Sequence, residues 1–464
     1  MGDDIELARI DAHASPGEPQ APLQTSTEQD HPTWHYARVV IAGFLVMSTT
    51  CAFIFSYGVY QSLYEEMARV DDTPFTGSST ALINLVGILA IALMSMGGPF
   101  AMHWAKIYSP QAVIIAGGWV FGIAYILSSL GTALWHFALT QGVLLGIGTC
   151  LAYVPTMSVA PTWFDKRRGL AMGVIISGSA VGGMIWPPAL RAMITHLGFR
   201  NALRISGCIS LVLVSIAGYA LRWEPKFEEQ VRIQTQGLRR RSGWMKAPMV
   251  NYRVARSKRF LAQGLGCFLQ SAGYSTPLFF YAAYASTLGY NATTAANFIT
   301  LNNASNFVSR IVIGYCADRY GRINALVATT LLSAVAVFAF WIPSMFHTGE
   351  VSKSSADGLF IVFTILYGAF ASAYISLFPA SLIELFGVQH FTSVNGALYL
   401  IRGMGALIGA PLTGMLIPKS GALTSSYFYE RAGIVTGVLL MAATLACLWV
   451  RIEASLGEAW KWRV

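Results

Sequence analysis

The sequence predicts an all-α membrane protein of about twelve transmembrane helices in two six-helix bundles, and three observations carry this prediction. Hydrophobic residues make up 55% of the 464-residue chain and charged residues only 11%, which is too little surface charge for a soluble fold of this length. The apolar residues gather in runs that can cross a bilayer as helices. One basic segment, residues 222–259, separates two tracts of such runs and carries eleven Lys or Arg and three Glu, so it supplies +8 of the formal net charge of +9.

The expected domains and spans follow from this layout. Residues 1–37 are polar and rich in Pro, Ser and Gln, so we expect a disordered cytoplasmic tail without a signal peptide. The other expected domains are a six-helix half over 38–222, a basic cytoplasmic linker over 223–258, a second six-helix half over 259–452 and a C-terminal tail over 453–464. We place the spans at 39–63, 79–103, 111–130, 135–163, 169–190, 201–221, 260–286, 294–316, 325–345, 358–386, 393–417 and 427–450.

Charge and motif content narrow the class of protein. Positively charged loops stay on the cytoplasmic side of a membrane, so we expect both termini and the basic linker to be cytoplasmic. The charge lies in one loop without aromatic-rich binding signatures, which argues against a nucleic-acid partner. The six cysteines lie singly in apolar runs, and the eight histidines form no ligand motif, so we expect no disulfide and no metal. The chain also lacks a G-x-x-x-x-G-K-[ST] phosphate loop. We therefore expect neither an enzyme nor a cofactor.

The sharpest motif closes the eighth expected span. Its residues are Gly314-Tyr315-Cys316-Ala317-Asp318-Arg319-Tyr320-Gly321-Arg322. This segment resembles the G-x-x-x-D-R-x-G-R loop signature of the major facilitator superfamily, in which the Asp and Arg side chains tie helix ends together on the cytoplasmic side. The resemblance implies two parallel halves with a substrate site between them at mid-membrane depth.

Within that superfamily the chain resembles the monocarboxylate porter family, especially its fungal members, over essentially its whole length after the tail. The residues that carry the resemblance are Gly58-Val59-Tyr60-Gln61, Trp163-Phe164, Lys166 to Gly173, Asn306, Arg310, Gly405 and Gly409-Ala410-Pro411. The resemblance implies transport of a small organic acid. Animal members have a Lys in the first span and an Asp at the place of Asn306, and this chain has neither. We therefore expect transport to depend weakly on a proton gradient.

Two arginines are the leading candidates for substrate binding. A lone Arg in the middle of a membrane helix costs at least ~2.5–3.5 kcal/mol, so Arg310 should face a polar cavity or partner. Its guanidinium could bind a substrate carboxylate through two hydrogen bonds. Asn303 and Asn306 recur with it at helical spacing, and the alternative is a structural cluster between helices. Arg402 is the second buried cation. It could complete an anion site, neutralise an acid or snorkel along its stem.

Four further residues complete the candidate set. Tyr274 and Tyr367 are assigned to the site, since a phenol offers both a ring face and a hydrogen-bond donor. Glu384 lies near the inner end of the tenth expected span. We expect it to pair with Arg319 or Arg322, and proton carriage is the alternative. Asn291 begins an N-x-T sequon in an expected outer turn, so glycosylation there stays open.

Three functions remain for such a chain. The first is a porter for a small organic acid, the second an efflux pump for a fungal secondary metabolite made by a neighbouring biosynthetic pathway, and the third a substrate sensor that does not transport. The expected partners are an organic anion and membrane lipid, with protons retained as an alternative coupling ion. We expect a monomer in the plasma membrane, with the vacuolar membrane as the alternative location.

Overall fold

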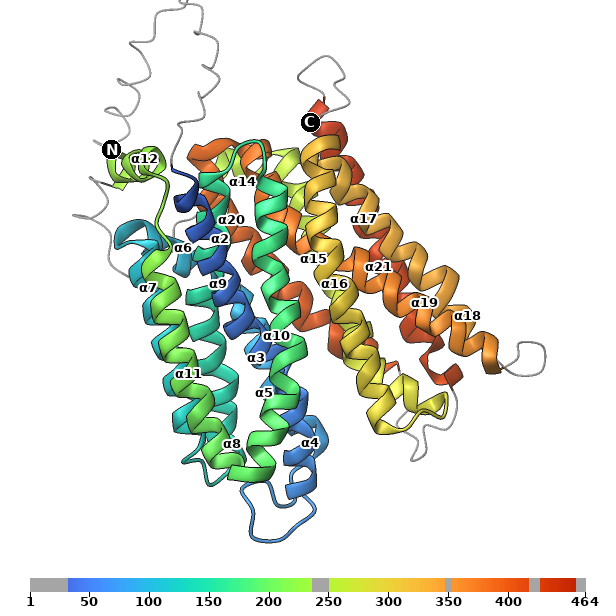
Figure 1. The fold of residues 1–464 in the computed structure, drawn as a ribbon. Coiled ribbons are helices and arrows are strands. Elements are labelled where there is room, and N and C mark those ends of the chain that lie inside the picture. Colours follow the sequence, from blue (N-terminus) through green and yellow to red (C-terminus); the bar gives the residue numbers. More distant parts are fainter. Residues whose placement is uncertain (1–31, 236–249, 347–352, 417–425, 456–464) are drawn as a thin grey trace, which may run out of the picture.

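The computed structural model describes residues 32–235, 250–346, 353–416 and 426–455. Within these ranges the chain is helical and contains no strand. Figure 1 shows two groups of long helices side by side, the first coloured blue to green and the second yellow to red. Consecutive helices run in opposite directions because short turns connect them.

The first half contains six membrane-length elements. They are α2 (Thr33–Val46) continued by η1 (Met47–Cys51), α3 (Ala52–Phe55) and α4 (Tyr57–Met67); α5 (Thr80–Met96) with α6 (Gly98–Ile107); α7 (Pro110–Ser128); α8 (Leu134–Phe137) with η2 (Ala138–Leu144) and α9 (Leu145–Trp163); α10 (Arg168–Leu197); and α11 (Phe199–Ala220). The start of α7 illustrates the local chemistry. Ser109 accepts the backbone N–H of Ala112, and Pro110 occupies the first turn, where no backbone donor is needed.

The second half follows a linker that contains α12 (Pro225–Thr235) and α14 (Tyr252–Ala255). Its elements are α15 (Lys258–Thr287); α16 (Ala292–Tyr320); α17 (Arg322–Ala336) with η3 (Val337–Trp341) and α18 (Ile342–Ser344); α19 (Lys353–Ala371); α20 (Ala373–Met415); and η4 (Ser426–Tyr429) with α21 (Glu430–Ser455). Two turns depend on glycine. Gly321 has φ +97° between α16 and α17, and Gly387 has φ +70° inside α20, where it separates the tenth span from the eleventh.

The number of membrane-length elements agrees with the predicted fold class. Nine helices of the described ranges are long and apolar enough to cross a membrane, and the bent pair of α5 and α6 makes ten. With α15 and α16, which are 30 and 29 residues long but more polar, the total is twelve. The prediction of an all-α membrane fold in two bundles is confirmed. Some boundaries differ from the expected ones, since α2 begins at Thr33, inside the expected tail, and α21 continues to Ser455, beyond the expected end of the second half.

The two halves meet along two pairs of elements. Helix α10 packs against α16, and α20 packs against α5 and α6. Glycines allow the backbones to approach closely, since a Cβ atom placed on Gly396 would lie 3.0 Å from the Cα atom of Pro99. One hydrophobic core cluster contains side chains of both halves, such as Met157 and Phe378. A second cluster lies inside the second half around Trp341.

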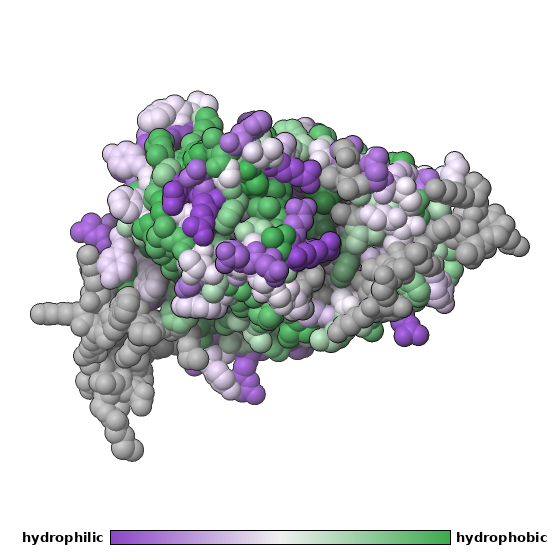
Figure 2. Space-filling model, turned by 90° about the horizontal axis from the view of Figure 1, so that it is seen from below, coloured by the Kyte–Doolittle hydropathy of each residue, from purple (hydrophilic) through white to green (hydrophobic). Residues whose placement is uncertain are grey.

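The molecule has one end that we call the basic end. It holds α12, α14 and both ends of the described chain, and the helices of the two halves diverge away from it (Figure 1). Figure 2 views the opposite end, where hydrophilic side chains surround apolar residues that lie deeper between the halves. Under the positive-inside rule, this is the end that we expect to face the cytoplasm.

Candidate functional site

Arg310 lies at the interface of the two halves. It belongs to α16, and only 3% of its surface is exposed. Its Nη1 atom donates to the backbone oxygen of Ile176 and to the Ser179 hydroxyl, 2.7 Å away, and both acceptors belong to α10. Tyr274 of α15 is a further neighbour of this guanidinium. The Nε atom has no partner within the described residues. A buried cation with neutral acceptors and a free donor can bind an anion.

Arg402 brings a second buried cation to the same region from α20. It is 7% exposed, and no hydrogen-bond partner for its Nη1 atom occurs in the described part of the chain. Its electrostatic neighbours include the phenols of Tyr153, Tyr399 and Tyr374 and the thiol of Cys267. None of these is a carboxylate. From the sequence, one possible role of Arg402 was to neutralise a nearby acid. These neighbours do not support that role.

Tyr153 connects the two arginines. This residue of α9 interacts electrostatically with both Arg310 and Arg402, and the two arginines also interact with each other. The Tyr399 hydroxyl donates to the Tyr153 hydroxyl over 3.4 Å, and the two rings meet edge to face. Cys51, at the end of η1, is a further neighbour of Arg310. The first half and the second half thus both contribute to one cationic site lined by phenols.

The other residues assigned to the site from sequence lie in three places. Asn303 faces the first half, since a Cβ atom on Gly183 of α10 would lie 3.0 Å from its Nδ2 atom. Asn306 faces its own half and accepts a hydrogen bond of 2.8 Å from Ser372, between α19 and α20. Tyr367 is fully buried, and its hydroxyl donates to the backbone oxygen of Tyr274 over 2.9 Å. The structure places Asn306 and Tyr367 in helix-to-helix contacts beside the site.

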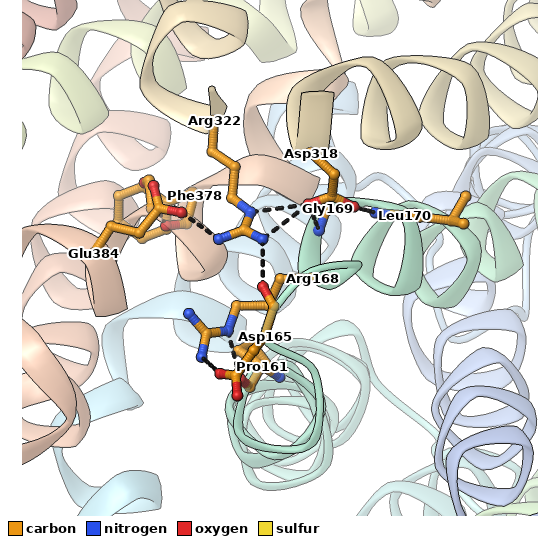
Figure 3. A network of polar contacts seen from close by, with 10 residues as sticks. Pro161, Asp165, Arg168, Gly169, Leu170, Asp318, Arg322, Phe378 and Glu384 are labelled. Atoms are coloured by element: carbon orange, nitrogen blue, oxygen red, sulfur yellow. Dashed lines mark hydrogen bonds and ion pairs between the residues drawn. The ribbon is translucent and has the colours of Figure 1, made fainter. Parts of the chain in front are cut away.

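A second polar network closes the basic end, and we call it the latch (Asp165, Asp318, Arg322 and Glu384; Figure 3). The Asp318 carboxylate accepts the backbone N–H groups at the start of α10, at 2.8 Å for Gly169 and 2.9 Å for Leu170. It also forms an ion pair of 2.9 Å with Arg322.

Arg322 joins the elements of the latch. Its guanidinium pairs with Asp318 of α16 and Glu384 of α20 and donates to the backbone oxygen of Asp165 in the first half over 2.8 Å. The structure thus gives Glu384 the Arg322 pairing that the sequence suggested as one of two options. Arg319 instead stacks over the Tyr315 ring at 4.9 Å.

The local sequence explains why the latch forms. Gly314 and Gly169 bring the ends of α16 and α10 together, because a Cβ atom on Gly169 would lie only 2.6 Å from the backbone oxygen of Gly314. The N–H groups of the first turn of a helix carry partial positive charge, which a carboxylate can neutralise. Gly321, with its positive φ, starts the next helix and so places Arg322 one turn beyond Asp318.

Several contributors were not identified from the sequence. Tyr153 is one of several tyrosines within the apolar runs, and single groups such as Ser179 and Cys51 carry no motif. Ser179 lies in a glycine-rich stretch of α10, and that close-packing signal could have indicated a contact with another helix.

Two further features concern the possible glycosylation site at Asn291 and the binding of a metal ion. Asn291 is exposed and caps α16 by accepting the N–H of Thr294 over 2.8 Å. Within the described ranges, the structure contains no group of three or more His, Cys, Asp or Glu residues that could hold a metal ion.

Two bundles of membrane-length helices with buried polar side chains between them are the architecture expected of a membrane transporter. The profile described as Major Facilitator Superfamily matches residues 39–354 and also residues 265–459. The chain belongs to this superfamily and is a multi-pass membrane transporter.

Relatives and a solved structure agree with this assignment. The chain is 27% identical to the agnestins efflux protein AgnL12 of Paecilomyces divaricatus, over 88% of this chain and 87% of the relative. It is 28% identical to the aspyridones efflux protein apdF of Emericella nidulans, over 85% and 74%. The proton:xylose symporter XylE superposes with a TM-score of 0.69 at 12% identity, over 89% of this chain and 95% of that structure, and so shares the fold.

Proposed function

We propose that this transporter exports an organic anion from the cytosol by alternating access. The observation that carries the proposal is Arg310, a buried cation at the interface of the halves that has only neutral partners and one free donor. A charge in this place is expensive unless an anion compensates it. A carboxylate fits best, because a guanidinium fork binds it through two parallel hydrogen bonds.

The relatives support export over uptake. Two of them are named as efflux proteins, one for agnestins and one for aspyridones. A porter for a small organic acid, as the resemblance to monocarboxylate porters implies, would use the same cation for a smaller substrate. Export of a carboxylate-bearing secondary metabolite accommodates both the cationic site and these relatives. We propose the plasma membrane as the location of this export.

Arg310 also connects substrate binding to the movement of the halves. Its two hydrogen bonds to α10 hold the first half against the second. A substrate carboxylate that binds the guanidinium competes with Ile176 and Ser179 for the same donors. Binding would then weaken one cross-half contact while the latch holds the basic end closed.

Proton coupling has little support among the side chains. Within the described residues, each acidic side chain of the membrane-length elements lies no more than four residues from an end of its element or from the break at Gly387. Glu384 is one of these, and it is already paired with Arg322. Because no carboxylate lies beside Arg310 or Arg402, protonation of the protein cannot readily alternate with substrate binding.

Flux from proteoliposomes tests the proposal. The purified protein is reconstituted into vesicles loaded with equal concentrations of aliphatic and aromatic carboxylic acids and their neutral amides, and the external solution is analysed by mass spectrometry. We expect at least one acid to leave the vesicles faster than from protein-free vesicles, while its amide does not. Release of amides in preference to acids would contradict the anionic site, and release of no compound would favour the sensor hypothesis.

A further inference from the structure

Two buried guanidinium groups lie well inside membrane-length helices, and none of the neighbours identified for them among the described residues is an acid. Arg310 is ten residues from the end of α16 at Tyr320, which is about 15 Å along a helix. Arg402 is fifteen residues beyond the break at Gly387, or about 22 Å. The elements on both sides provide phenols, a thiol, a hydroxyl and a backbone oxygen as neighbours of these cations. The site therefore carries two positive charges that these neighbours do not neutralise.

From these charges we infer that the substrate carries two acidic groups, one bound by Arg310 and the other by Arg402. The inference rests on the proposed function and narrows its substrate class to dianions. A monoanion would leave one charge uncompensated in a region where charged side chains are normally paired. A dianion neutralises both, and it also reduces the electrostatic repulsion between the two guanidinium groups.

Unpartnered hydrogen-bonding groups occur near both arginines, as a ligand with two acidic groups requires. The Nε atom of Arg310 is unpartnered on the α16 side, while on the α20 side the Nη1 atom of Arg402 and the hydroxyl of Tyr374 are unpartnered within the described residues. All three groups are buried. Buried donors without partners are costly, so a ligand acceptor at each position gains full hydrogen-bond energy.

Tyr153 indicates what lies between the two acidic groups. Its phenol interacts with both guanidinium groups, so it lies in the region that a bridging ligand has to cross. The edge-to-face contact with Tyr399 at 5.5 Å makes this region aromatic. An apolar or aromatic body that separates two carboxylates, or a carboxylate and an acidic enol, would complement these rings.

A matched pair of probes tests this inference. Isophthalate and its monomethyl ester share one ring and differ by a single negative charge at neutral pH. Thermal stabilisation of the purified full chain in detergent gives an apparent Kd for each probe. We expect isophthalate to bind about tenfold more tightly than the ester, because it makes one more charge-assisted interaction.

Two variants decide whether Arg402 causes that preference. Arg402→Gln should bring the ratio of the two Kd values close to one, and Arg402→Lys, which keeps the charge, should retain a clear preference for isophthalate. Arg200→Gln, on an exposed residue at the start of α11, is the matched control and should keep the full ratio. If Arg402→Gln does not fold, the Lys variant still decides, since loss of the preference despite a retained charge contradicts the account.

Other outcomes separate the inference from the proposed function. Equal Kd values in the wild-type protein, or a preference that persists in Arg402→Gln, would overturn the dianionic substrate. If neither probe binds to a preparation that releases monocarboxylic acids from proteoliposomes, the dianionic substrate is also overturned. Export of an organic anion would then remain supported. Absence of any carrier-dependent flux would instead count against the proposed function.

Discussion

The Asp318 carboxylate in the second half accepts the backbone N–H groups of Gly169 and Leu170, which begin α10 in the first half. This contact joins the halves through a charge and a helix N-terminus, and such bonds contribute about 1.5–3 kcal/mol each when the acceptor is ionised. The side chain is 8% exposed, so water and salt screen the contact only partly. Asp318 is therefore the central residue of closure at the basic end.

Asp318→Asn should open the basic end. The amide keeps one acceptor but removes the charge, so the closed state loses stability relative to a state that is open to the cytosol. The probe is a cysteine in place of Ser158, which is fully buried and accepts a hydrogen bond of 2.8 Å from Asn395 across the halves. In a background without the six native cysteines, we expect maleimide to label this cysteine about tenfold faster in the Asn variant.

The control for that measurement is Arg319→Gln. Arg319 belongs to the same motif but stacks on the Tyr315 ring outside the latch, so its loss should leave the labelling rate unchanged. An equal labelling rate in Asp318→Asn and the parent would show that the carboxylate does not hold the halves together.

Gly169→Ala should block closure without preventing folding. A Cβ atom there would lie 2.6 Å from the backbone oxygen of Gly314 and 3.0 Å from the Asp318 carboxylate, so α10 and α16 would have to move apart. We expect flux to fall at least about tenfold at normal membrane abundance. Gly358→Ala is the matched control, because a Cβ atom meets nothing within 4 Å there. Wild-type flux in Gly169→Ala would contradict the close approach.

The sequence was informative where charge and motif decide the structure. The apolar runs and the basic segment predicted the fold class, and the unusual position of a charge inside an apolar run identified Arg310 and Arg402. The contacts between halves were not predictable, because Ser179 and Tyr153 have no distinctive neighbours in the chain. Asn303 and Asn306 show the limit of helical spacing. They share one broad face of α16, yet one side chain faces the first half and the other bonds to Ser372 in its own half.

Substitution of Tyr153 should affect substrate binding, whereas substitution of Tyr367 should affect only helix packing. Tyr153→Phe removes a hydroxyl that interacts with both arginines and should raise the half-saturating substrate concentration several-fold with little change in thermal stability. Tyr367→Phe removes a buried hydrogen bond to the Tyr274 backbone and should lower stability by about 1 kcal/mol without changing that concentration. Flux curves and thermal unfolding of both variants provide the comparison. The opposite pattern would place Tyr367 in the site and Tyr153 outside it.

Transport should depend only weakly on an imposed pH gradient. Glu384 pairs with Arg322 at the basic end, and the middle of each membrane-length element holds no other carboxylate. Glu384→Gln should lower flux by weakening the latch and should leave the small gradient dependence as it was. Flux that rises steeply with the gradient, in both the wild type and Glu384→Gln, would reveal a proton route through other groups.

The proposed export of an organic anion depends most on Arg310, so substitution of this residue is the most direct test. The measurement is carrier-dependent release of a carboxylic acid from proteoliposomes that contain equal amounts of wild type, Arg310→Lys or Arg310→Gln. We predict that the Gln variant inserts normally but releases the acid no faster than protein-free vesicles, and that the Lys variant retains part of the flux because it keeps the charge without the fork. Wild-type release by Arg310→Gln would remove the cation from the site and contradict export of an organic anion through it.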